Sequence, residues 1–187
     1  DDEFPKDNHI IAANEGAAIG LGIGYHLSSG KTPLIYLQNS GLGNTVNPLL
    51  SLASSEVYSI PILLLIGWRG EPGVKDEPQH IHQGRVTPNL LDAMDIPYII
   101  IDSQMSQDEV LNSIIDQLDI CNKEKKPVCV LVRKGTFESY KKKSNESPHN
   151  NLKLEREEAV EIAAKECEKD AVIVCTTGML SRELFEY

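Results

Sequence analysis

The stretch PILLLIG at residues 61–67 is a nearly continuous apolar run without a polar side chain to mark a solvent-facing side. Such a run is expected of a β-strand covered on both faces, as in parallel sheets flanked by helices. Further strand-like runs occupy residues 9–13, 33–38, 96–102 and 126–134. Helix-like spacing lies between them, at residues 44–59, 88–95 and 106–118.

Strands that alternate with helices predict an α/β fold, with a mostly parallel sheet and helices on both of its faces. We expect residues 1–134 to form this domain. Residues 135–153 are polar and almost without aliphatic side chains, which predicts a linker. An amphipathic helix pattern then leads into a strand, a turn and a helix start, so residues 154–187 are expected to begin a second α/β domain.

Composition and charge disfavour several classes of protein. The 28 acidic residues outnumber the 18 basic ones, and the net charge of -10 argues against a general nucleic-acid binder. No apolar window approaches the length of about 18 residues that a membrane span needs, and no signal-like leader opens the chain. The four cysteines have no C-x-x-C spacing, so we expect buried free thiols and a cytoplasmic protein.

The segment from His9 to Gly30 places an acid, Glu15, directly after an apolar run and three glycines in a helix-like stretch behind it. Each glycine inside a helix costs about 1 kcal/mol relative to alanine. The small residues of this segment share one helical face: Ala13, Ala17, Gly20 and Gly24. A smooth face of this kind allows another backbone to approach, either the protein's own sheet or a second subunit.

Two glycine patterns, GLGIG at 20–24 and SGLGNTV at 40–46, resemble the dinucleotide fingerprint but do not complete it. No acid ends the next strand, where a ribose would need one, so a nicotinamide site is disfavoured. Glu15 lies at the expected carboxyl end of a strand, where open α/β sheets bind ligands. The alternative is an ordinary favourable contact between an acid and a helix N-terminus.

Residues 13–84, from ANEGAAIG through NSGLGN and SIPILLLIG to DEPQHIHQG, closely resemble the phosphonopyruvate and sulfopyruvate decarboxylases, which are thiamine-diphosphate enzymes. The likeness covers most of residues 9–134, and TTGMLSRELFE at 176–186 is similar to the opening of the family's other domain. The resemblance implies a pyrimidine-binding domain that lacks its first strand, followed by the start of a diphosphate-binding domain. It also implies thiamine diphosphate and Mg²⁺ as cofactors, with the metal ligands outside this segment.

In this family, the glutamate that opens the helix faces N1′ of the cofactor's aminopyrimidine, and Glu15 matches it. A carboxyl group can exchange a proton there, whereas a glutamine amide could only form a hydrogen bond. The resemblance further implies cofactor contacts by Asn39, Gly41, Thr177 and Gly178. It implies substrate contacts by Asn44, Arg69, His80 and Gln83.

The segment that contains Arg69, His80 and Gln83 is punctuated by glycine and proline and is expected to be a loop. It also carries Lys75, His82 and Arg85. A phosphono or sulfo group with a carboxylate would need such cations and donors, although a solvated loop would have the same composition. Two neighbouring histidines near two acids, without a clear third ligand, do not predict a metal site.

The expected reaction is decarboxylation of phosphonopyruvate to phosphonoacetaldehyde and carbon dioxide, a step of phosphonate biosynthesis. Sulfopyruvate, as in coenzyme M synthesis, is the nearest alternative substrate, and a non-catalytic domain of the same fold is the alternative function. The family resemblance also implies a homo-oligomer with its site at the subunit interface and a small anionic 2-oxo acid as ligand. The fragment alone is not expected to be active.

Overall fold

The computed structural model describes residues 9–139 and 156–166. The chain divides into two compact units, Asp1–Lys141 and Lys142–Tyr187. In the second unit, a helix predicted from the sequence is found as α5, Arg156–Glu166. The strand, turn and helix start predicted after it lie outside the described residues, and the domain limits at 134 and 154 stay predictions.

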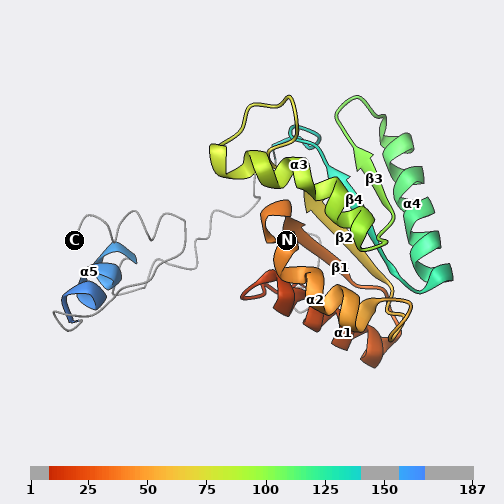
Figure 1. Cartoon of the computed structure of the whole chain (residues 1–187), viewed down its shortest axis with the longest axis horizontal. Coiled ribbons are helices and arrows are strands. Elements are labelled where there is room, and N and C mark those ends of the chain that lie inside the picture. The colour runs from red at the N-terminus through yellow and green to blue at the C-terminus, as the bar shows by residue number, and fades with distance from the viewer. Residues whose placement is uncertain (1–8, 140–155, 167–187) are drawn as a thin grey trace. The chain divides into compact units, whose positions relative to one another are not determined.

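The first unit is built on a four-stranded sheet whose strands are all parallel (Figure 1). Its strands are β1 (Leu34–Gln38), β2 (Ile62–Gly67), β3 (Tyr98–Ile101) and β4 (Pro127–Val132). They lie in the order β1-β2-β4-β3, so the two most apolar runs occupy the centre. The predicted α/β class and its parallel sheet are confirmed. Because all strands run the same way, their carboxyl ends form one edge where loops of different origin meet.

Helices cover both faces of this sheet. One face carries α1 (Glu15–Ser29), α3 (Pro78–Ala93) and a helical run between β1 and β2, while α4 (Gln107–Glu124) covers the other (Figure 1). The helical run consists of η2 (Asn39–Thr45), α2 (Val46–Pro48) and η3 (Leu49–Ala53). This run covers residues 39–53, whereas the sequence predicts a helix at 44–59. The observed run therefore starts and ends earlier than predicted. The predicted cap of α4 is found as a complete capping box between Ser106 and Glu109.

Residues 9–13 do not form the strand that the sequence predicts. They are irregular, and the side chains of Ile10 and Ile11 are 67% and 87% exposed. An apolar run becomes a strand only where a neighbour satisfies its backbone and a packed face buries its side chains. In the described part of the chain, β1 pairs with β2 alone and gives residues 9–13 no partner.

Helix α3 begins at Pro78, well before the short helix predicted at 88–95. The prediction was wrong because a proline usually ends a helix, and Pro88 lies inside this one. Pro88 has no N–H to donate to the carbonyl of Gly84, four residues earlier. The indole Nε1 of the buried Trp68 donates to that carbonyl instead, at 2.8 Å. A tertiary contact therefore supplies the hydrogen bond that proline removes.

We expect Trp68→Phe to lower the free energy of unfolding by about 1–3 kcal/mol, because it leaves the carbonyl of Gly84 without its donor. In the double variant with Pro88→Ala, the new N–H of residue 88 can donate to that carbonyl. The double variant should therefore be less destabilised than the sum of the single changes, by about 1 kcal/mol. Urea denaturation of the four proteins of this cycle measures the coupling, and additive effects would contradict the exchange of donors.

Among the described residues, no helix combines the length and the apolar character needed to cross a membrane.

Candidate functional site

Glu15 is the first residue of α1 and lies at the carboxyl edge of the sheet, beside η2. Asn14 caps the helix, its side chain accepting from the backbone N–H of Ala17 at 2.8 Å. The Glu15 carboxylate is half-buried and accepts a hydrogen bond from Nδ2 of Asn44 at Oε2, at 2.9 Å. This bond, together with one from its own backbone, lowers the pKa of Glu15 below its ordinary value.

Gly41 lies directly against the Glu15 side chain. A Cβ atom on Gly41 would come within 2.2 Å of Cδ and 2.3 Å of Oε1 of Glu15, far inside van der Waals contact. Gly41 and Asn44 are three residues apart in η2, and a 3₁₀-helix brings residues at this spacing onto one face. Three of the residues proposed from the sequence, Glu15, Gly41 and Asn44, therefore meet at one point.

Asn39, the first residue of η2, is 4% exposed and makes its hydrogen bonds within the protein. Its Nδ2 donates to the carbonyl of Arg69 and to Oγ1 of Thr87, both at 2.9 Å, and its Oδ1 accepts from the backbone N–H of Arg69 at 2.9 Å. Asn39 thus joins the ends of β1 and β2 to α3. The polar side-chain atoms of Asn39 therefore already bind protein groups. The cofactor contact expected of Asn39 stays a prediction.

Thr87 was not found by reading the sequence. Its hydroxyl accepts from Asn39 and donates to the carbonyl of Gln83 at 2.7 Å, one helical turn earlier. A buried threonine that bonds back to its own helix in this way gives no distinct signal in the sequence.

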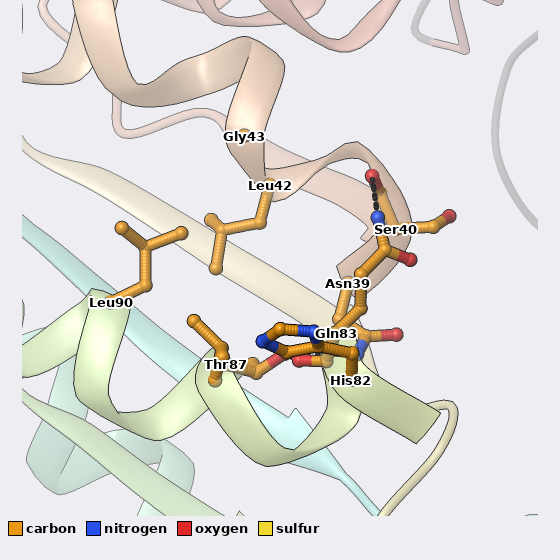
Figure 2. Close-up of a pocket in the computed structure, with 9 residues that line it drawn as sticks. Asn39, Ser40, Leu42, Gly43, His82, Gln83, Thr87 and Leu90 are labelled. Carbon is orange, nitrogen blue, oxygen red and sulfur yellow. Dashed lines mark hydrogen bonds between the residues drawn. The ribbon is translucent and has the colours of Figure 1, made fainter. Parts of the chain in front are cut away.

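A cavity of about 240 Å³ lies between η2 and α3. Polar side chains line part of it, those of Asn39, Ser40, His82, Gln83 and Thr87, and the rest of its lining is Leu42, Gly43, Val86 and Leu90. Figure 2 shows the Gln83 amide turned towards Ser40, where Nε2 donates to the backbone carbonyl at 3.3 Å. Since Gly41 and Asn44 contact Glu15, η2 presents one face to the carboxylate and another to this cavity.

Arg69 is held by an acid of its own loop. Its Nε donates to Oδ2 of Asp76 at 2.8 Å and its Nη2 to Oδ1 at 2.5 Å, a bidentate pair in which the Asp76 side chain is only 5% exposed. Asp76 also accepts from the backbone N–H of Gly70 at 2.8 Å. The hydrogen bonds from Arg69, then that from Gly70, hold the pKa of Asp76 well below its usual range. Two donors of the guanidinium, Nε and Nη2, are therefore already engaged by Asp76, and the substrate contact expected of Arg69 stays a prediction.

The other proposed loop residues are mostly on α3, because that helix begins at Pro78. His80 is half-buried, and its Nδ1 has no hydrogen-bond partner among the described residues. His82 reaches the cavity, while Lys75, before the helix, and Arg85, within it, are exposed. Within residues 9–139 and 156–166, no three His, Cys, Asp or Glu side chains gather to hold a metal ion. Thr177 and Gly178 lie outside the described residues.

The chain is similar to known proteins along most of its length. The family described as thiamine pyrophosphate enzyme, N-terminal TPP binding domain, matches residues 2–96. A phosphonopyruvate decarboxylase of Streptomyces viridochromogenes is 32% identical over 97% of the chain, which spans 48% of that relative's length. The sulfopyruvate decarboxylase subunit alpha of Methanothermobacter thermautotrophicus is 37% identical over 70% of the chain and 75% of its own length. The sulfopyruvate decarboxylase subunit alpha of Methanococcus maripaludis is 38% identical over 66% of the chain and 70% of its own length.

Proposed function

The chain belongs to the thiamine pyrophosphate enzymes, and from that membership we propose that the whole protein decarboxylates phosphonopyruvate to phosphonoacetaldehyde with thiamine diphosphate and Mg²⁺. This chain would supply the carboxyl group that activates the cofactor and part of the substrate pocket. The observation that carries the proposal is the meeting of Glu15, Gly41 and Asn44 at the carboxyl edge of the sheet, within the matched segment. The role of each of these residues is part of the proposal.

The residues at this point fit the aminopyrimidine of the cofactor. Gly41 carries no side chain, so the Glu15 carboxylate can lie directly against its backbone, and Asn44 binds only Oε2 of that carboxylate. When bound, thiamine diphosphate supplies the electron sink that lets a 2-oxo acid lose carbon dioxide. Glu15 would hold and return a proton at its carboxylate, and Asn44 would keep that group in place. We propose Thr177 and Gly178 as contacts for the diphosphate.

The choice of phosphonopyruvate rests on the extent of the likeness. Similarity to two phosphonopyruvate decarboxylases runs through 97% and 95% of the chain, into the second unit, whereas the sulfopyruvate alpha subunits align with 49% to 70%. The sulfopyruvate alpha subunits have the higher identity to this chain, at 37–38%, within their shorter alignments. This identity makes sulfopyruvate the second candidate substrate. For either substrate, Arg69, His80 and Gln83 are the proposed partners of the anionic groups.

The decisive experiment offers phosphonopyruvate, sulfopyruvate and pyruvate in parallel to the full-length protein with thiamine diphosphate and Mg²⁺. We expect the highest kcat/KM with phosphonopyruvate. A preference for sulfopyruvate would keep the chemistry and change the substrate. Absence of turnover with all three, in a protein that is folded, would favour the non-catalytic alternative.

We also propose that the protein forms a dimer through α1, with the site at the contact between subunits. An ideal Cβ on Gly20 or Gly24 meets no atom within 4 Å, so the described subunit does not require glycine at either position. Leu21 and Leu27 on the same helix are 49% and 69% exposed. Gly22 differs, since its Cβ would come within 2.7 Å of Cδ1 of Ile35 in the subunit's own sheet.

We further propose a cytoplasmic location. The buried free thiols of Cys121 and Cys129 support a reducing, cytoplasmic location.

The variant Gly24→Ala tests whether glycine is needed at this position for packing within the subunit or for a contact between subunits. Alanine should stabilise the helix by about 0.5–1 kcal/mol, because nothing in the subunit opposes it. At a tight contact, overpacking of about 1–3 kcal/mol would raise the dimer Kd roughly tenfold or more. Sedimentation velocity and urea denaturation of the full-length protein measure both effects, with Asn112→Ala on the exposed side of α4 as the control. A more stable protein with an unchanged Kd would place the dimer contact elsewhere.

A further inference from the structure

The two oxygens of the Glu15 carboxylate have different surroundings. Oε2 accepts from Nδ2 of Asn44 at 2.9 Å. Oε1 instead lies over the bare Cα of Gly41, where a Cβ would come within 2.3 Å of it. The protein therefore binds one oxygen with a side-chain donor and packs the other against a residue that has no side chain.

Asn44 is itself fixed relative to the start of α1. Its backbone carbonyl lies so close to the helix that a Cβ on Gly16 would come within 3.0 Å of that oxygen. The amide thus approaches Glu15 from a backbone that is packed against Glu15's own helix. An amide held in this way can fix the plane of the carboxylate, since rotation about the last side-chain bond would break the hydrogen bond.

Few other groups act on the charge of Glu15. The elements packed most closely against α1 are η2, α2, η3 and β1. Among the described residues of these four elements, the only titratable side chain is that of Tyr36. Tyr36 is 74% exposed and points to the other face of β1 from Ile35, which packs against α1. Asn44 is therefore the main neighbour through which the protein controls this carboxylate.

We infer that Asn44 is a positioning residue, which binds Oε2 of Glu15 so that Oε1 is the oxygen that exchanges a proton with the aminopyrimidine. This inference rests on the proposed function, and it gives Asn44 a role different from substrate binding. Asn44 touches neither the cofactor nor the reacting atoms in this role. Its effect passes through the orientation and the charge of Glu15.

The test titrates the Glu15 carboxyl by ¹³C NMR in the full-length protein without cofactor, with the signal assigned from a Glu15→Gln sample. We expect Asn44→Ala to raise the pKa of Glu15, because the hydrogen bond from Asn44 lowers it. Asn44→Asp should raise the pKa further, since a second carboxylate disfavours the charged form. Asn47→Ala, an exposed asparagine of the same helical run, is the matched control and should leave the pKa unchanged.

The pH profile of turnover gives the second readout. Glu15 must be ionised to accept a proton, so the rate falls as the pH falls through its pKa. Asn44→Ala should move this acid limb to higher pH and lower kcat about tenfold or more, with a smaller change in KM. Asn44→Gln, which keeps the donor, should recover part of kcat.

An unchanged pKa of Glu15 in Asn44→Ala would overturn the inference, and so would a loss of kcat that is equal at every pH. Failure of the proposed function is recognised separately, because the wild-type protein would then not turn over phosphonopyruvate. The NMR titration contains no cofactor or substrate, and its result does not depend on that outcome.

Discussion

The variant Glu15→Gln should lose nearly all decarboxylation, with kcat of the full-length protein about 10²- to 10⁴-fold below wild type. The amide can accept a hydrogen bond but cannot take up and return a proton at physiological pH. Its size and shape match the carboxylate, so the position of α1 should not change. Steady-state release of carbon dioxide at saturating thiamine diphosphate and Mg²⁺ measures the loss.

Two controls separate chemistry from folding in this experiment. Glu56→Gln removes one negative charge at an exposed turn and should leave kcat unchanged. Glu15→Gln should also remain as stable as wild type at neutral pH to within about 1 kcal/mol, the size of one exposed hydrogen bond. If Glu15→Gln turns over phosphonopyruvate as fast as wild type, Glu15 is an ordinary N-terminal acid of a helix.

The pH dependence of stability gives the same residue a second test. The pKa of Glu15 is lowered in the folded protein, so its ionised form contributes stability above the unfolded-state pKa. That contribution is lost as the pH falls through the folded-state pKa. Glu15→Gln should therefore flatten the decline of stability on the acid side, as measured by urea denaturation at a series of pH values.

Local patterns account for much of the fold. The runs at β2 and β4 carry apolar side chains on both faces, and the sheet buries them on both faces as their composition predicts. The start of α4 follows from Ser106 and Glu109, whose side chains satisfy each other's backbone N–H groups within a single turn. In both cases the determining interaction is local, or depends only on burial.

The errors arise where a distant residue changes the outcome of a local rule. Pro88 predicts the end of a helix, yet α3 continues through it because the indole of Trp68 binds the freed carbonyl of Gly84. The run at 9–13 has the composition of a strand, but it has no neighbour to pair with in the described sheet. A single sequence records neither the donor nor the missing partner.

The candidate site likewise combines residues that the sequence identifies with contacts that only the structure shows. The family resemblance singled out Glu15, Gly41 and Asn44, whereas only the structure shows that Asn44, 29 residues away, donates to the carboxylate of Glu15. It also shows that Arg69 is paired with Asp76, which the sequence left as one acid among several in a polar loop. Pairings of this kind depend on side-chain geometry, which composition and spacing do not determine.

Gly41→Ala should abolish most activity while leaving the fold intact. The new methyl group would occupy the space that Cδ and Oε1 of Glu15 now fill, at 2.2–2.3 Å, so the carboxylate must move. Because a misplacement of about 1 Å at a reacting group can cost about 10²-fold in rate, we expect kcat to fall by at least about 10²-fold. The fold should tolerate the change, since Gly41 does not have a left-handed backbone conformation.

Gly43→Ala is the matched control for this variant, in the same helical turn. Gly43 lines the neighbouring cavity, but a Cβ on it meets no atom within 4 Å and does not approach Glu15, so kcat should fall far less than in Gly41→Ala. If both alanine variants lose activity equally, the turn needs glycine for flexibility, and the contact with Glu15 is not the reason. If neither loses activity, the carboxylate can move away from Gly41 without cost, and its position against this glycine is not what catalysis requires.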